Sequence, residues 1–174
     1  MQGIERLTHS LDSISIAVGR AAAWCSVPII FIVILDVVTR RFFTLGSVTL
    51  QELEWHFHAI LFLGCAGWAY LTDSHVRVDV FRARVSERKQ VWIELLGGIL
   101  FLLPFCVVMI YLGSKFTLDS FYMNEVSDAP GGLPYRYIIK SAFPLGFVIL
   151  LLQGISQVLK SYLFLFRGPT KGGA

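Results

Sequence analysis

The sequence predicts an all-α integral membrane protein with four transmembrane helices, short interfacial helices and both termini in the cytoplasm. Of its 174 residues, 55% are hydrophobic and 16% are charged, and the mean hydropathy is +0.66. Soluble domains are rarely so apolar. Four windows contain no Asp, Glu, Lys or Arg, namely 21–35, 55–72, 95–114 and 141–159. The last three are long enough, at about 1.5 Å per residue, to cross a hydrocarbon core of about 30 Å.

The first membrane helix is expected over residues 14–38. Its apolar window is the shortest, but Arg20 can extend its side chain toward the headgroups and lengthen it. Pro28 is expected to kink it. Residues 1–13 place Ile4, Leu7 and Leu11 at helical spacing, which predicts a short amphipathic helix in the membrane plane. We expect no cleavage of this segment as a signal peptide, because acidic residues precede the apolar core and the small residues come before it.

The remaining helices are expected over 51–71, 88–113 and 137–163, and the whole chain, 1–174, forms one transmembrane domain. The segment 115–125 is expected to prolong the third helix or to lie on the membrane surface. Before the fourth helix, the segment NEVSDAPGGLP contains two prolines and two glycines that force turns.

The orientation follows from the lysines and arginines, which gather on the cytoplasmic side of membrane proteins. The two termini and the loop between the second and third helices carry ten of them, and the opposite side carries five. The basic segment FRARVSERK is therefore read as a topology and phospholipid-headgroup signal, and no nucleic-acid partner is expected.

The second helix opens with a polar cluster of Glu52, Glu54, His56 and His58. Each acid lies four residues before a histidine, so the two Glu–His pairs point to nearly opposite sides of the helix. A zinc ion needs three or four converging ligands, and the HExxH order is absent. Three readings stay open: acids hydrogen-bonded to imidazoles at the interface, a metal site, and polar groups that are satisfied by a neighbouring subunit.

No Asp, Glu, Lys or Arg falls in the middle of a predicted span. A protein that moved an ion or an anion by itself would be expected to place such a group there. Gln153, Ser156 and Gln157 are the deepest strongly polar side chains and are expected to form hydrogen bonds between helices. No nucleotide, esterase or haem-attachment motif occurs, and the three cysteines have no metal spacing. We expect neither an enzyme nor a cofactor.

Two other classes remain as alternatives. A haem-binding membrane anchor of a redox enzyme would use His56 and His58, although one helix cannot supply an axial pair on facing helices. A small proton-coupled exporter would use an acid inside the membrane, for which Glu94 is the best placed residue.

The chain resembles the small membrane subunit of tripartite ATP-independent periplasmic (TRAP) transporters, the DctQ-like family, over residues 14 to 160. Five segments carry the resemblance in order: DVVTRRF, QELEW, LGCAGWAYLTDSHVRVDVF, NEVSDAPGGLP and IKSAFPLGFVILLLQGI. In that family a large multi-span membrane subunit carries an organic acid and sodium through an elevator movement, and a periplasmic substrate-binding protein delivers the substrate. The resemblance implies that this chain enlarges the static scaffold in the inner membrane and takes no direct part in substrate binding.

The resemblance also indicates residues that position the helices or contact the large subunit. We expect Glu52 and Glu54 to meet either that subunit or Arg40, and His75 and Asp79 to fix the inner loop. The positions that match the family's recurrent residues are Asp36, Arg40, Glu52, Glu54, His75, Asp79, Glu125, Ser127, Pro134, Lys140 and Pro144.

Overall fold

The protein is described by a computed structural model over residues 2–44, 46–74 and 85–167, and every regular element in these ranges is helical. The all-α prediction is therefore confirmed. The helices are α1 (Gln2–Ala23), α2 (Ser26–Phe42), α3 (Val48–Leu71), α5 (Glu87–Gly97), a π-helical turn η1 (Gly98–Leu102), α6 (Leu103–Tyr122) and α7 (Tyr137–Arg167).

Three helical stretches in the described ranges are long and apolar enough to cross a membrane. They are Gly3–Phe42, Glu87–Tyr122 and Tyr137–Phe166. The predicted span 51–71 lies in α3, which is not among the three, because the acids and histidines in its first half lower its hydropathy.

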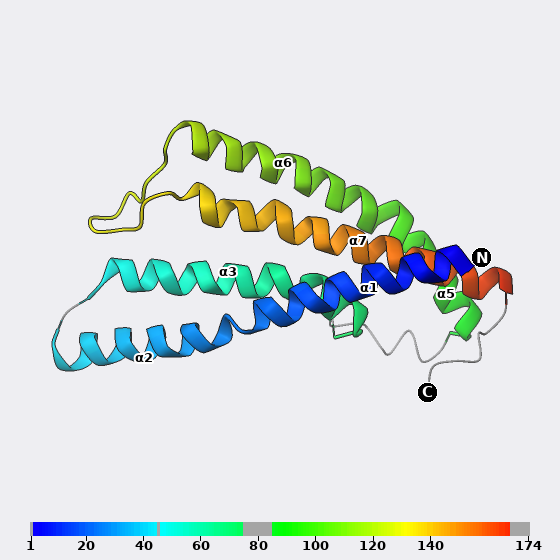
Figure 1. The fold of residues 1–174 in the computed structure, drawn as a ribbon, viewed down its shortest axis with the longest axis horizontal. Helices are drawn as coiled ribbons and strands as arrows, with labels where there is room; N and C mark the ends of the chain where they lie inside the picture. The colour runs from blue at the N-terminus through cyan, green and yellow to red at the C-terminus, as the bar shows by residue number, and fades with distance from the viewer. Residues whose placement is uncertain (1, 45, 75–84, 168–174) are drawn as a thin grey trace.

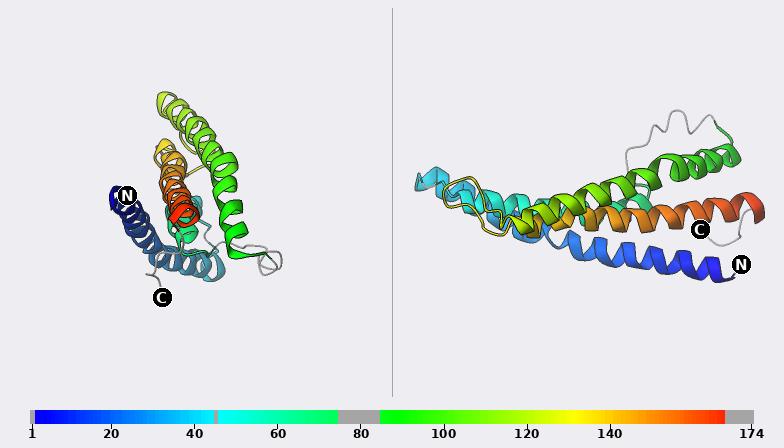
Figure 2. Two further views of the ribbon diagram at one scale, coloured as in Figure 1. Left: turned by 90° about the vertical axis from the view of Figure 1, so that its right-hand side faces the viewer. Right: turned by 90° about the horizontal axis from the view of Figure 1, so that it is seen from above.

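The helices form one elongated bundle in which α7 is central (Figures 1 and 2). It packs against α1 and α3 on one side and against α5 and α6 on the other, whereas α2 packs against α3. The start of α1 and the end of α7 lie at one end of the bundle. The α2–α3 connection and the loop 123–136, which we call the outer loop, lie at the opposite end (Figure 1).

The break between α1 and α2 lies at Trp24 and Cys25 and is explained by Pro28. Proline has no N–H, so the carbonyl of Trp24 cannot receive its usual bond from position 28. It accepts instead from Val27 N at 3.1 Å, and the Oγ of Ser26 donates to the carbonyl of Ala23 at 2.7 Å. The predicted kink is thus present, and α2 diverges from α1 beyond it (Figure 1).

The N-terminal segment differs from the prediction. No separate helix ends near residue 13, because α1 continues unbroken to Ala23 and packs along α3 and α7. Of the three apolar residues that defined the predicted membrane-facing side, Leu11 is buried and Leu7 is exposed. The buried face instead includes Thr8, Leu11 and Ser15, so contact with other helices sets the orientation of this segment.

The third predicted helix is longer than 88–113 and contains an irregular turn. It extends from Glu87 to Tyr122, so the segment after Lys115 does prolong it. The turn η1 ends two residues before Pro104, whose missing N–H and bulky ring disturb the regular bonding of the preceding turn. By contrast, Pro144 lies inside α7 without ending it.

Small residues let the helix backbones approach closely, as is common between membrane helices. A Cβ atom added at Gly64 of α3 would lie 2.5 Å from the Cβ of Ala22 in α1. One added at Gly67 would lie 2.8 Å from Ile149 Cγ2 in α7. These two contacts fix α3 between α1 and α7.

We predict that Gly64→Ala destabilises the purified protein by roughly 1–3 kcal/mol, because the methyl group of Ala22 cannot rotate away and the backbone must move. Gly97→Ala is the matched control, since nothing lies within 4 Å of a Cβ at that position. The control should be neutral or stabilising by up to about 1 kcal/mol. Thermal unfolding in detergent measures both, and equal melting temperatures for the two variants would contradict the packing described here.

Candidate functional site

The polar side chains that the sequence singles out form three groups in the structure. The first group ties the outer loop to α3 and α7, and the second joins α1 to α7. The third lies on α3 and has no polar partner among the described residues. Within the described residues, no three side chains among His, Cys, Asp and Glu come close enough together to hold a metal ion.

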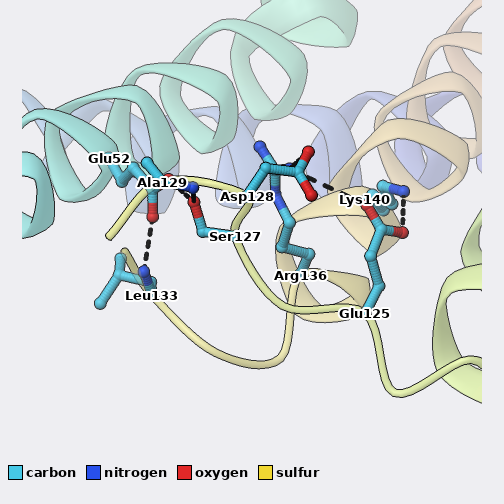
Figure 3. A network of polar contacts seen from close by, with 8 residues as sticks. All are labelled: Glu52, Glu125, Ser127, Asp128, Ala129, Leu133, Arg136 and Lys140. Carbon is cyan, nitrogen blue, oxygen red and sulfur yellow. Dashed lines mark hydrogen bonds and ion pairs between the residues drawn. The ribbon is translucent and has the colours of Figure 1, made fainter. Parts of the chain in front are cut away.

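Glu52 anchors the outer loop to the first turn of α3 (Figure 3). One carboxylate oxygen accepts a hydrogen bond from Ser127 Oγ, and the other accepts from the backbone N–H of Leu133 at 2.6 Å. Thr49, one turn earlier, donates to the carbonyl of Gly131 at 2.6 Å. Of the two partners expected for Glu52, Arg40 pairs with Asp36 instead, and contact of Glu52 with the large subunit stays a prediction.

The turn in the outer loop requires glycine at two positions. Gly131 has a φ of 78°, in the left-handed region that glycine adopts without strain. The next residue, Gly132, has no room for a side chain, because a Cβ there would collide with Ser127 and approach Glu52 Oε1 to 3.0 Å. The two glycines thus shape the loop so that Ser127 and Leu133 both face Glu52.

Glu125 links the same loop to the start of α7 (Figure 3). Its carboxylate forms an ion pair with Lys140, and Arg136 lies 3.9 Å from its other oxygen. The ammonium of Lys140 also lies 3.9 Å from the centre of the Phe116 ring on α6, within the range of a cation–π contact. The bond from Lys140 lowers the pKa of Glu125, and the charge of Arg136 acts in the same direction.

Asp36 and Arg40 form an ion pair at the outer end of α2, as their spacing of four residues predicts. Asp36 is buried, whereas the side chain of Arg40 is 53% exposed. The second carboxylate oxygen of Asp36 is buried and has no hydrogen-bond partner within the described residues.

His75 and Asp79, which were expected to fix the inner loop, lie outside the described residues.

A second polar group joins the two ends of the sequence. Asp12 of α1 accepts hydrogen bonds from Gln153 Nε2 at 3.0 Å and Ser156 Oγ at 2.7 Å, and it pairs with Lys160 Nζ at 2.6 Å. Gln153 and Ser156 are fully buried. The expectation that these two side chains bond between helices is thus met, but their partner is a carboxylate.

Sequence reasoning missed Asp12 because it assigned residues 1–13 to a helix outside the bundle. A signal was available: Gln153, Ser156 and Lys160 share one face of α7, at spacings of three and four. Such a polar stripe on an apolar helix predicts a polar partner on a neighbouring helix. The stripe does not show which helix supplies that partner.

The four residues of the Glu–His cluster in α3 have different environments. Glu52 is bonded to the loop, and His56 Nδ1 donates to the backbone carbonyl of Glu52 at 2.5 Å, not to its carboxylate. Glu54 and His58 have no polar partner within the described residues. They line a shallow depression of about 390 Å³ together with Trp55, Ala59 and Phe62.

The comparisons with known proteins identify one family. The family model described as tripartite ATP-independent periplasmic transporters, DctQ component, matches residues 29–163. The matched residues run from α2 into the last turns of α7 and include Asp36, the outer loop and all of α3, whereas α1 precedes them. No curated protein and no solved structure matches the chain.

We predict that Asp12→Asn and Lys160→Met each lower the free energy of unfolding by roughly 1–3 kcal/mol, because each leaves a polar partner unpaired between helices. The double variant should lose less than the sum of the two single losses. Unfolding by denaturant in detergent measures the cycle. Additive losses would show that the two charges do not interact.

We predict that the Glu125–Lys140 pair contributes stability that depends on pH. The folded-state pKa of Glu125 lies below its ordinary value of 4.5, so the contribution is complete above that value and is lost as the pH falls through the folded-state pKa. The melting temperature of Glu125→Gln should therefore lie below that of the wild type at pH 7, and the difference should shrink as the pH falls below about 4.5. A constant difference down to pH 3 would contradict the ion pair.

Proposed function

The chain belongs to the DctQ component family of the tripartite ATP-independent periplasmic transporters, and from this membership we propose that it is the static scaffold subunit of a sodium-driven uptake system for an organic acid. It is a membrane protein and a transporter component, not an enzyme. We propose that a large multi-span membrane subunit carries the substrate by an elevator movement and that a periplasmic binding protein delivers it. This chain then supports the large subunit and does not touch the substrate.

We further propose that the chain crosses the inner membrane four times, with α3 as the fourth span and both termini in the cytoplasm. α3 has 24 residues, which at about 1.5 Å per residue is long enough for a hydrocarbon core of about 30 Å. The start of α1 and the end of α7 lie at one end of the bundle (Figure 1). The excess of lysine and arginine in the terminal segments and the second loop favours the cytoplasm for that end.

The observation that supports the scaffold role is that acidic side chains of the helices form ion pairs with basic side chains of this chain. Asp12 is neutralised by Lys160 and Asp36 by Arg40. A carboxylate that bound a transported cation would have to release a partner of this kind in each cycle. Asp12 joins α1 to α7 and Asp36 is paired within α2, which suits a part that does not change shape during transport.

The proposal is tested by expressing the chain together with the large membrane subunit of its transporter. A tag on this chain should retrieve the large subunit in detergent at a ratio of one to one. Liposomes that contain both subunits, together with the binding protein outside, should accumulate the organic acid when a sodium gradient is imposed. Liposomes with either membrane subunit alone should not.

Two results would overturn the proposal. One is a large subunit that transports at the same rate in liposomes that lack this chain. The other is uptake or efflux by this chain alone, which would place the transport pathway within its own helices.

A further inference from the structure

The polar cluster at the start of α3 separates into a satisfied half and an unsatisfied half. Glu52 and His56 are bonded within the chain, to the outer loop and to the helix backbone. Glu54 and His58, four residues apart, share another side of the helix. Neither has a polar partner among the described residues.

The side that carries Glu54 and His58 also carries large exposed aromatic groups. Trp55 is 76% exposed and Phe62 is 73% exposed, and both line the depression of about 390 Å³ with the two polar residues. Gly67, which meets Ile149 of α7, lies on the opposite side of α3. We call the side formed by Glu54, Trp55, His58, Ala59 and Phe62 the open face of α3.

Lipid is a poor environment for this face. His58 lies six residues after the loop-bound Glu52, which is about 9 Å further along α3. In the four-span arrangement proposed above, His58 falls within the charge-free window 55–72, where an imidazole without a polar partner is unfavourable in hydrocarbon. Glu54, one turn nearer the end, has the same need for a partner that carries a positive charge.

The other exposed surfaces of the bundle differ in this respect. α2 exposes a broad apolar surface that includes Phe31 and Ile34, and η1 exposes Phe101. An apolar groove of about 590 Å³ lies between α1, α3 and α7. Acyl chains can cover all of these without leaving a polar group unpaired, so none of them requires a protein partner.

We propose that the open face of α3 is the surface that binds the large membrane subunit. The inference rests on the proposed function and adds the location and chemistry of the contact. The occupant is a transmembrane helix of the large subunit that places an arginine or lysine against Glu54 and a hydrogen-bonding group against His58. An apolar side chain of the same helix fills the depression between Trp55 and Phe62. Buried aromatic anchors around a charge pair are typical of the residues that dominate binding energy at interfaces.

Photo-crosslinking in the assembled transporter tests the location. The photoreactive amino acid p-benzoylphenylalanine replaces Phe62, and matched variants carry it at Phe31 and Phe101, which are also phenylalanines at 69% and 75% exposure. Irradiation of membranes that contain both subunits should join position 62 to the large subunit and leave positions 31 and 101 uncoupled. Coupling from position 31 or 101 but not from 62, coupling of 62 to a second copy of this chain, or no protein coupling from 62 would overturn the inference.

Charge substitutions test the chemistry. Glu54→Arg should reduce recovery of the large subunit on the order of tenfold or more, and Glu54→Gln should reduce it less, because a neutral group is not repelled by the partner's cation. Glu87→Arg is the control, since Glu87 is an exposed acid at the start of α5, and it should leave recovery unchanged. Equal recovery with Glu54→Arg and Glu87→Arg would overturn the inference.

These experiments distinguish a failure of the proposed function from a failure of the proposed location. If the unmodified chain fails to retrieve the large subunit, the proposed function fails as well. If the unmodified chain retrieves it and the open-face variants do so equally well, the proposed function stands and the location is wrong. Thermal unfolding of each variant alone shows whether it is folded. The melting temperature should stay close to that of the wild type, because Phe62 is exposed and the half-buried Glu54 has no polar partner to lose among the described residues.

Discussion

The structure depends on one constraint: a polar group that enters a membrane must find its partner inside protein. In this bundle the partners come from distant parts of the sequence. Asp12 near the N-terminus bonds to Gln153, Ser156 and Lys160 near the C-terminus. Glu52 at the start of α3 holds the loop that leads into α7. The two ends of the bundle are therefore each fastened by a carboxylate, and the apolar contacts between the helices fill the length between them.

The same constraint connects the fold to the function. Carboxylates that are bonded to neighbouring helices stabilise one arrangement of those helices and are not free to bind cargo. In α3, half of the polar cluster is bonded within the chain, and the other half has no polar partner among the described residues. The fold leaves the open face of α3 without polar partners among the described residues, and we propose that a companion subunit covers it. The proposed scaffold role and the proposed docking surface both rest on this distribution of polar partners.

Much of the fold was predictable from the sequence because it is encoded locally. Charge-free windows located the long helices, Pro28 predicted the break near Trp24, and the spacing of four predicted the pairing of Asp36 with Arg40. The contacts that fix the tertiary arrangement were not predictable, because their partners are far apart in the chain. Glu52 and Leu133 are separated by 81 positions, and Asp12 and Lys160 by 148. A periodic pattern shows that a face is polar, but it does not show which helix will meet it.

The most direct test of the account is a distance measured within this chain while the assembled transporter works. Spin labels are placed at Phe42→Cys and Tyr122→Cys, which are highly exposed at the C-terminal ends of α2 and α6. The native Cys25, Cys65 and Cys106 are replaced by alanine. The distance between the two labels would report any rearrangement of the bundle. A static scaffold predicts one distance distribution that is the same with and without sodium, substrate and the binding protein. A shift of several ångströms when these are added would show that the bundle itself moves and would contradict the account.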